Sequence, residues 1–242
     1  MQSLSKAYLD ALRFSTKEVA SLKALGEFRG KQQLFSRQSP EVLESLRRTA
    51  IVESGESSNR LEGITAPRKR IVALMQDDTA PRDRFEQEIA GYRDVLNHIH
   101  SNHAQIEFSP STVLQSHAAM MKYVSPEGGH WKTRDNVIIE RYPDGSRRVR
   151  FKPVAASRTE QAMKQLVERY HYAVYQDARE PLIVVPLAIL DFLCIHPFDD
   201  GNGRCSRLLL GPPAVSPGIR RWALHQPGAR LRADKRDRKS VV

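Results

Sequence analysis

The stretch HPFDDGNGRCSR, residues His196–Arg207, decides how the rest of the chain is interpreted. It follows a strongly apolar run over residues 181–195 and leads into three leucines, so it predicts a helix end, a tight loop and the start of another helix. Gly201 and Gly203 let the backbone approach a ligand and leave amide groups free at a helix N-terminus. This arrangement favours an anion such as a phosphate.

Charged and titratable side chains in the same stretch suit phosphate chemistry. Arg204 and Arg207 are three residues apart, so a helix would place both on one face, where they could contact phosphates. Asp200 offers a hard oxygen ligand for Mg²⁺. His196, as a neutral imidazole, could accept a proton from an attacking hydroxyl. Each residue alone also has an ordinary explanation as a capping, loop or solvent-facing side chain, so only their combination indicates phosphate chemistry.

The combination resembles the signature HxFx[DE]GNGRxxR of the Fic family, which matches at every fixed position. The resemblance implies a mainly α fold, a Fic-type helical bundle with a β-hairpin flap beside the active site. It implies transfer of AMP from ATP to a Ser, Thr or Tyr hydroxyl of a target protein. It also implies roles: general base for His196, Mg²⁺ ligand for Asp200, anion hole for Gly201, Asn202 and Gly203, β-phosphate contact for Arg204, γ-phosphate contact for Arg207, and core anchor for Phe198.

A second motif lies upstream, in the sequence ESSNRLEGI. Ser58, Glu62 and Gly63 fit the pattern [ST]xxxE[GN], which resembles the inhibitory motif that Fic proteins carry on a helix before the core. By this resemblance, Glu62 would pair with Arg207 and stop the γ-phosphate of ATP from docking productively. An ordinary capped helix end is the alternative explanation.

Residues 136–151 predict one β-hairpin in an otherwise helical chain. NVIIERY at 136–142 and SRRVRF at 146–151 are strand-like and flank Pro-Asp-Gly, a turn sequence. In the Fic family such a hairpin is a flap that pairs with the backbone of the target as an added strand. The resemblance therefore assigns target docking to Val137, Ile138 and Ile139, with a purely structural hairpin as the alternative.

Apolar residues at helical spacing predict the remaining helices. The run 181–195 is so apolar that we expect it at the centre of the core. His117 resembles a residue of a family helix, and we expect a structural role for it. The other expected helices cover 3–28, a segment that starts at Ser39 and Pro40, a short helix near 57–61, and 68–77, 83–100, 110–121 and 157–176.

The end of the chain departs from the family pattern. Residues 211–242 are rich in Pro, Gly and Arg, and their eight Lys and Arg against two Asp carry +6 of the net charge of +10. If codons for residues 218–228 are read one nucleotide later, they can spell a sequence like that of family members, so we hypothesise a frameshift. A divergent, disordered basic tail is the alternative.

The motifs divide the chain into four expected parts. These are an N-terminal helical extension (1–45), an inhibitory helix region (46–67), a Fic core (68–210) and the aberrant basic tail (211–242).

Composition narrows the remaining function classes. With 242 residues, 40% apolar and 27% charged, the chain is expected to be globular, and it has no run of about 18 apolar residues that could span a membrane. Two cysteines make no disulfide framework, so we expect a cytoplasmic protein. The expected partners are ATP, with Mg²⁺ as cofactor, and a target protein, but no membrane and no nucleic acid; a homodimer stays open because family members often dimerise. The alternatives are a catalytically impaired remnant, a Fic enzyme that removes AMP or uses another nucleotide, and, more distantly, a nucleic-acid-binding regulator.

Overall fold

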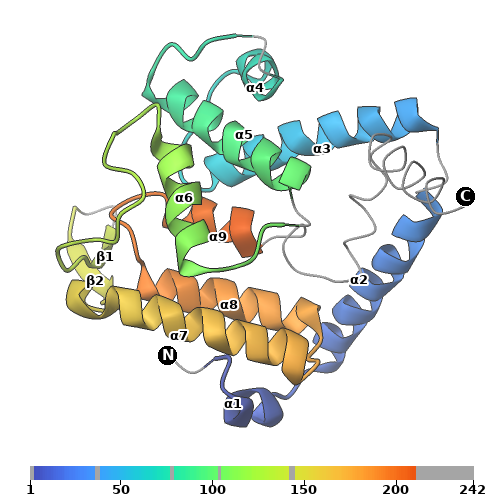
Figure 1. Cartoon of the computed structure of the whole chain (residues 1–242), viewed down its shortest axis with the longest axis vertical. Coiled ribbons are helices and arrows are strands. Elements are labelled where there is room, and N and C mark those ends of the chain that lie inside the picture. Colours follow the sequence, from blue (N-terminus) through green and yellow to red (C-terminus); the bar gives the residue numbers. More distant parts are fainter. Residues whose placement is uncertain (1–2, 36–38, 77–78, 103–104, 142–144, 211–242) are drawn as a thin grey trace, which may run out of the picture.

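The computed structural model of the chain describes residues 3–35, 39–76, 79–102, 105–141 and 145–210. Helices dominate these residues, and one antiparallel pair of strands accompanies them (Figure 1). The mainly α fold with a β-hairpin is therefore confirmed. The elements are α1 (Lys6–Ala11), α2 (Thr16–Phe35), α3 (Pro40–Arg60), α4 (Arg68–Met75), α5 (Arg84–Asn102), α6 (Pro110–Met121), β1 (Ile138–Arg141), β2 (Arg147–Phe151), η1 (Ala156–Arg158), α7 (Thr159–His171), η2 (Tyr172–Gln176), α8 (Pro181–Ile195) and α9 (Asn202–Leu210).

The short helix α9 lies in the middle of the bundle. It packs against α3, α5, α6 and α8, while α7 and α8 run side by side along one edge (Figure 1). Its three leucines, Leu208–Leu210, are buried in the same core as Ile89 and Tyr92 of α5 and Phe192 of α8. The loop that precedes α9 is therefore anchored from behind by the hydrophobic core.

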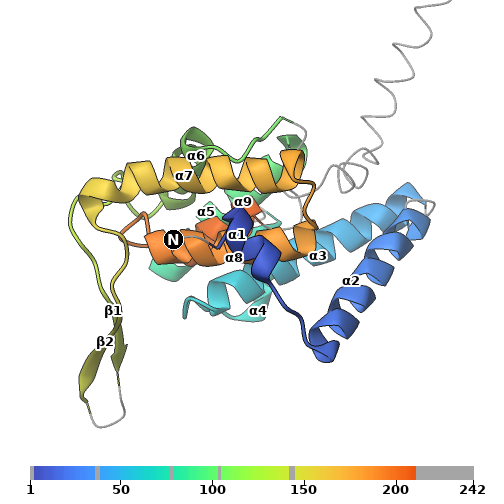
Figure 2. The same cartoon turned by 90° about the horizontal axis from the view of Figure 1, so that it is seen from below.

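The N-terminal segment fastens to the outside of the bundle. Leu4 is buried, the Ser3 hydroxyl donates to Asp191 of α8 at 2.7 Å, and Asp10 forms an ion pair with Arg179. From there α2 extends away from the body of the molecule (Figure 2). The single helical segment expected over 3–28 is thus two helices, and the second continues to Phe35.

Helix starts follow the capping signals in the sequence. The hydroxyls of Ser39 and Ser109 accept hydrogen bonds from the amides of Val42 and Thr112, each at the start of a helix whose first residue is proline. The separate short helix expected near 57–61 is wrong, because α3 runs without a break to Arg60.

Two glycines explain the course of α3. Gly55 sits inside the helix where a Cβ atom would lie 2.5 Å from the Met75 side chain, so its lack of a side chain allows α4 to pack closely. Gly63, at φ +76°, adopts a left-handed conformation that favours glycine and turns the chain away after the helix.

The prediction for α8 needs a correction. Val184, Ala188, Phe192 and Ile195 are buried, but Leu190 is 49% exposed, so one face of the helix packs inward and the other is only partly covered by the described residues. Apolar composition overstated its burial, because periodicity cannot separate the two faces of a helix that is apolar all round.

The remaining expectations concern the hairpin, the tail, the domain division and membrane-spanning helices. The hairpin strands are shorter than expected, and Pro143 and Asp144 of the predicted turn lie outside the described residues. The tail 211–242 and the frameshift hypothesis also lie outside them, and the division of the chain into domains stays a prediction. Within the described ranges, none of the helices combines the length and apolarity needed to cross a bilayer.

Candidate active site

The turn between α8 and α9 begins in an unusual backbone conformation. His196 follows the last residue of α8 with φ 52° and ψ 62°, and its amide donates to the Phe192 carbonyl at 2.9 Å. This left-handed conformation is uncommon outside glycine. Gly201, at φ +77°, makes the second sharp bend, where a Cβ would lie 2.7 Å from the Met120 side chain. The turn therefore depends on its surroundings to hold its shape.

Phe198 anchors the turn in the core, as expected. Its ring is fully buried and stacks on His117 of α6, with 3.7 Å between the ring centroids and 3° between the ring planes. The Asn202 side chain bonds both polar groups of the Phe198 backbone, accepting from its amide at 2.9 Å and donating to its carbonyl at 2.8 Å. The Asn202 amide thus holds the turn together, and a part for this residue in an anion site stays a prediction.

His117 supports the turn from α6. The Gly129 amide donates to its Nδ1 at 2.9 Å, so Nε2 carries the proton and faces the Asp200 carbonyl at 3.2 Å. Burial lowers the pKa of His117 to about 4, so the ring is neutral at physiological pH. The expected structural role is confirmed.

Replacing His117 with alanine is expected to lower the free energy of unfolding by about 2–3 kcal/mol, because it removes a buried stacking partner and leaves the Gly129 amide without an acceptor. His98 is exposed on α5 and provides the matched control. His98→Ala is expected to change stability by less than about 0.5 kcal/mol. Urea unfolding of both variants at pH 7 measures the difference, and equal stabilities would contradict this role of His117.

The His196 side chain suits a general base. The ring is partly buried, and burial lowers its pKa below the ordinary histidine value, with a further lowering from the positive charge of Lys132. Its Nδ1 is enclosed and has no hydrogen-bond partner among the described residues. Because Nδ1 is enclosed, we expect a substrate to approach Nε2.

The two arginines of the motif have different surroundings. Arg204 is 1% exposed, and its Nη1 lies 2.8 Å from Oε2 of Glu88 on α5. Arg207 is partly exposed and faces the end of α3. The structure therefore places the two guanidinium groups against different helices rather than side by side.

The upstream motif, at the end of α3, contacts Arg207 of α9, which lies 145 residues after Glu62 in the sequence. Arg207 Nη2 donates to Glu62 Oε1 at 2.7 Å and to the Ser58 carbonyl at 2.9 Å, and Arg207 Nε donates to the Ser58 hydroxyl at 2.9 Å. Glu62 also covers the first turn of α9, since a Cβ atom on Gly203 would lie 2.0 Å from Glu62 Oε1. A carboxylate thus stands where the free amides at this helix start would otherwise face an anion.

Asp200 is the predicted ligand of a divalent cation, and this role stays a prediction. Its side chain is 55% exposed, Oδ1 accepts from the Gly201 amide at 2.6 Å, and Oδ2 lies 3.9 Å from a guanidinium nitrogen of Arg84. No group of three or more potential metal ligands occurs among the described residues. One carboxylate fits Mg²⁺, which commonly takes one or two protein oxygens and completes its shell with phosphates and water.

The predicted flap stands beside the turn with its strands exposed. β1 and β2 pair Ile139 with Val149, and both side chains are nearly half exposed. The hairpin projects from the body of the molecule (Figure 2). Val137 is exposed and Ile138 is half-buried, so these residues are accessible on the hairpin, and their part in target docking stays a prediction.

Two buried charged residues that contact the predicted site residues or their backbone were not predicted. Glu88 pairs with Arg204, and Lys132 bonds the backbone beside His196. Glu88 lies four residues before Tyr92, on the apolar face of its helix, which is a signal that could have indicated a buried carboxylate. Lys132 gave no such signal, because its segment has no regular periodicity.

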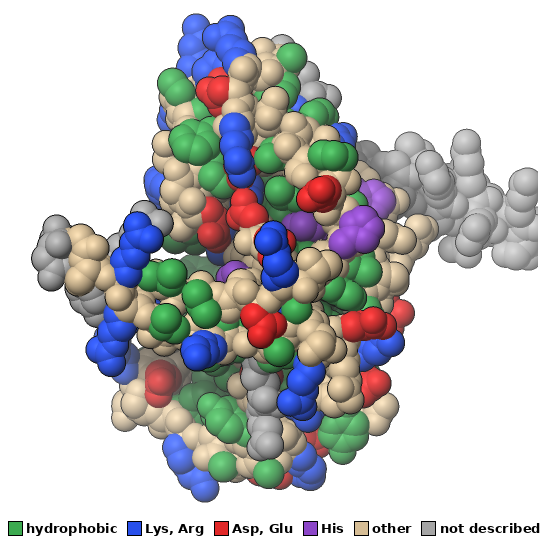
Figure 3. All heavy atoms as spheres, turned by 90° about the vertical axis from the view of Figure 1, so that its left-hand side faces the viewer, with side chains coloured by type: hydrophobic (Ala, Val, Ile, Leu, Met, Phe, Trp, Pro, Cys, Tyr) green, Lys and Arg blue, Asp and Glu red, His purple; other side chains and the backbone are tan. Residues whose placement is uncertain are grey.

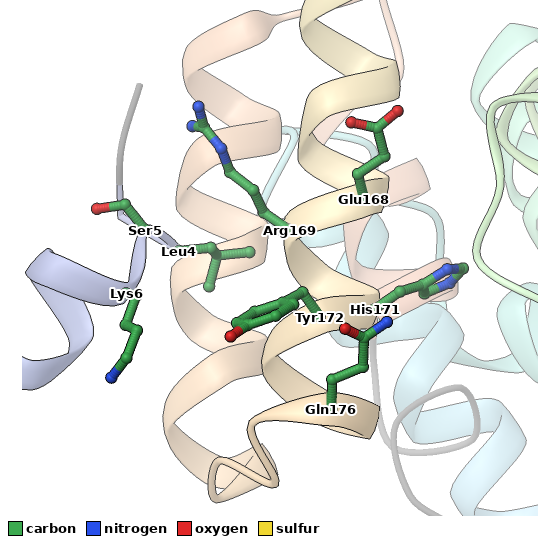
Figure 4. A pocket seen from close by; sticks show the side chains of 8 residues that line it. All are labelled: Leu4, Ser5, Lys6, Glu168, Arg169, His171, Tyr172 and Gln176. Atoms are coloured by element: carbon green, nitrogen blue, oxygen red, sulfur yellow. The ribbon is translucent and has the colours of Figure 1, made fainter.

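Other surface features lie apart from this turn. A cavity of about 590 Å³ separates the N-terminal segment from α7 and η2, and it is lined by Leu4, Lys6 and Tyr172 among others, none of them a predicted site residue (Figure 4). On the face that Figure 3 shows, acidic, basic and histidine side chains lie close together across the middle.

Comparisons with known proteins agree with the fold and the motif. Residues 107–211 match the family model described as Fic/DOC family. Protein adenylyltransferase Fic of Drosophila erecta is 28% identical over 140 residues, and that of Drosophila melanogaster 26%; each match covers 54% of this chain and 26% of the relative's length. This chain therefore spans about a quarter of the length of the curated relatives it matches. The matched region, residues 107–211, is thus similar to the Fic/DOC family, and the fold of the chain resembles that of Fic proteins.

Solved structures share the architecture. A Fic domain containing signaling protein from Bacteroides thetaiotaomicron has a TM-score of 0.65 at 21% identity, over 84% of this chain and 73% of that one. Fic-1 from C. elegans, residues 134–508, has a TM-score of 0.60 at 19% identity, over 91% of this chain and 66% of that one. At these identities the likeness concerns the fold.

Proposed function

We propose that this chain transfers AMP from ATP to a hydroxyl side chain of a target protein, and that Glu62 restrains the reaction by pairing with Arg207. The relatives named protein adenylyltransferase support the reaction class. The observation that carries the proposal is the meeting of Glu62 and Arg207 over Gly203, on the helix that the His196 turn introduces. ATP and a target protein are the partners that this reaction needs.

The reaction is a displacement at the α-phosphorus. The target hydroxyl attacks that phosphorus while Nε2 of His196 takes the hydroxyl proton. A bond forms between the target oxygen and the α-phosphorus, and the bond to the bridging oxygen of the β-phosphate breaks. Pyrophosphate leaves with that oxygen. Free amides at the start of α9 and the Arg207 guanidinium stabilise the charge on the phosphate oxygens.

Asp200 would hold Mg²⁺ against the phosphates, where the ion would neutralise part of their charge. The Arg204 guanidinium, which is paired with buried Glu88, also lies 3.9 Å from Asp200 Oδ1. Residues of the chain thus supply a base, a single metal ligand and two cations around one loop.

Restraint follows from the position of the Glu62 carboxylate. A phosphate that approached Arg207 would meet a like charge already bonded to that guanidinium. Ser58 bonds Arg207 through both its hydroxyl and its carbonyl, so Arg207 stays in place when Glu62 is removed. We infer that loss of Glu62 opens the phosphate position without dismantling it.

The reaction class is tested with ATP labelled either at the α-phosphate or at the γ-phosphate. The Glu62→Gly variant, incubated with Mg²⁺ and a cell lysate, is expected to transfer the α-label and none of the γ-label to protein. Transfer of the γ-label would indicate a phosphoryl transfer and would overturn the proposal. Release of free AMP without labelled protein would indicate hydrolysis instead.

The pH profile provides an independent prediction. Because burial lowers the pKa of His196, the base stays neutral below the ordinary histidine value and is protonated only at lower pH. The acid limb of kcat/KM for Glu62→Gly is therefore expected to have its midpoint below about 6.5. Rates measured from pH 5 to 8, with thermal melts at each pH to confirm folding, check this, and a midpoint above that value would contradict the assignment.

A further inference from the structure

The segment between α6 and β1 holds the chain on both sides of His196. The backbone amide of Lys132 donates to the Pro197 carbonyl at 2.9 Å, and its ammonium donates to the Ile195 carbonyl at 3.1 Å. These carbonyls belong to the residues directly before and after His196. A single residue from a distant segment thus fixes both neighbours of the proposed base.

The ammonium of Lys132 is buried in an unusual way. The residue is 4% exposed, and the second acceptor of its ammonium is the side-chain oxygen of Asn136 at 2.9 Å. Both acceptors are neutral oxygens. A buried cation held by neutral oxygens has a high desolvation cost, so stability alone is a poor explanation for it.

The Lys132 ammonium lies at the C-terminal end of α8, where it can stabilise the start of the His196 turn. The Ile195 carbonyl is one of the carbonyls that α8 leaves unbonded at its C-terminal end, where a positive charge is favoured. His196 follows in the left-handed conformation, which persists only where its surroundings hold it. Lys132 supplies that support through the carbonyl immediately before the strained residue.

Asn136 extends the contact to the flap. Its side-chain nitrogen donates to the Phe198 carbonyl at 3.4 Å, and β1 begins two residues later at Ile138. Trp131, the neighbour of Lys132, stacks on Phe198 with 5.5 Å between ring centroids. The root of the flap and the His196 turn therefore share one set of contacts centred on Lys132.

We propose that Lys132 is a positioning residue, whose buried ammonium holds the backbone around His196 and fixes the root of the flap relative to the His196 ring. The catalytic consequence rests on the proposed function, because a base and a docked hydroxyl react only at a defined separation. The positional statement concerns the resting protein and can be tested without turnover.

The charge of Lys132 acts on the His196 ring, so removing it should change the pKa of His196, which NMR can measure. The charged side chains that act on the His196 ring are Lys132, which lowers its pKa, and Glu62 and Asp200, which raise it. Asp135 and Asp199 act on the ammonium itself. Removing the ammonium is therefore expected to raise the pKa of His196.

The test compares Lys132→Met and Lys132→Arg in the full chain, with Lys164→Met on the exposed face of α7 as the matched control. NMR titration of the His196 ring in the resting protein is expected to show a higher midpoint in Lys132→Met and an unchanged one in Lys164→Met. On the Glu62→Gly background, Lys132→Met is expected to lower kcat on the order of 10-fold or more at an unchanged KM for ATP. Lys132→Arg, which keeps the charge and the donors, is expected to recover most of that loss.

An unchanged His196 titration together with a kcat within twofold of the reference in Lys132→Met would overturn the inference. If Lys132→Met fails to melt cooperatively, Asn136→Ala replaces it, because it removes one acceptor of the ammonium and the bond to Phe198. Retention of kcat in that variant would overturn the inference equally. If Glu62→Gly itself transfers no label, the proposed function fails, and the backbone chemical shifts around His196 in Lys132→Met and Lys164→Met then decide whether Lys132 holds the turn.

Discussion

Replacing Glu62 with glycine is expected to raise the initial rate of AMP transfer on the order of 10²-fold. The carboxylate occupies Arg207 and covers Gly203, and an interaction of this kind with developing phosphate charge is worth about two orders of magnitude in rate. Arg207 keeps its two bonds to Ser58 in the variant, so the phosphate contact survives. Initial rates with α-labelled ATP over a range of ATP concentrations measure the effect.

Glu53→Gly provides the control for this prediction. Glu53 is exposed on the same helix, so the variant carries the same chemical change at a position far from Arg207. It is expected to transfer AMP at the rate of the unmodified protein. Equal rates for Glu62→Gly and Glu53→Gly would show that Glu62 exerts no restraint.

Replacing His196 on the Glu62→Gly background is expected to lower the rate of transfer by about 10²–10⁴-fold, the usual contribution of a general base. Asparagine tolerates the left-handed conformation better than alanine does, so His196→Asn keeps the turn while His196→Ala removes the ring and adds strain. Both variants are expected to lose activity, and His98→Ala is expected to retain it. Full activity in His196→Asn with a normal melt would assign the base elsewhere.

Local signals in the sequence predicted most of the secondary structure. Serine caps followed by proline located the starts of α3 and α6, and Pro-Asp-Gly between two strand-like runs indicated the hairpin. These signals act within a few residues, so they do not depend on the rest of the fold. The same local reasoning missed the continuity of α3 past Gly55, because this glycine makes room for the Met75 side chain of another helix, a contact that the local sequence does not reveal.

The motif predicted which residues gather at the turn, but it did not predict their geometry, and their catalytic roles stay predictions. The motif from His196 to Arg207 gave the side chains, but the partners of Arg204 and the hydrogen bonds of Asn202 depend on packing between distant segments. Lys132 is the clearest example. Its ammonium and its backbone amide donate to the carbonyls of Ile195 and Pro197, which are more than 60 residues away in sequence. No sequence spacing predicts these contacts.

The central claim is that the His196 turn transfers AMP to protein hydroxyls and that Glu62 restrains it. Tandem mass spectrometry of proteins from one lysate, incubated with ATP and Mg²⁺ and either Glu62→Gly or Glu62→Gly/His196→Ala, tests it most directly. The account predicts Ser, Thr or Tyr side chains that carry adenosine monophosphate in the first sample and their absence from the second. No such side chain in either sample, or equal amounts in both, would contradict the account.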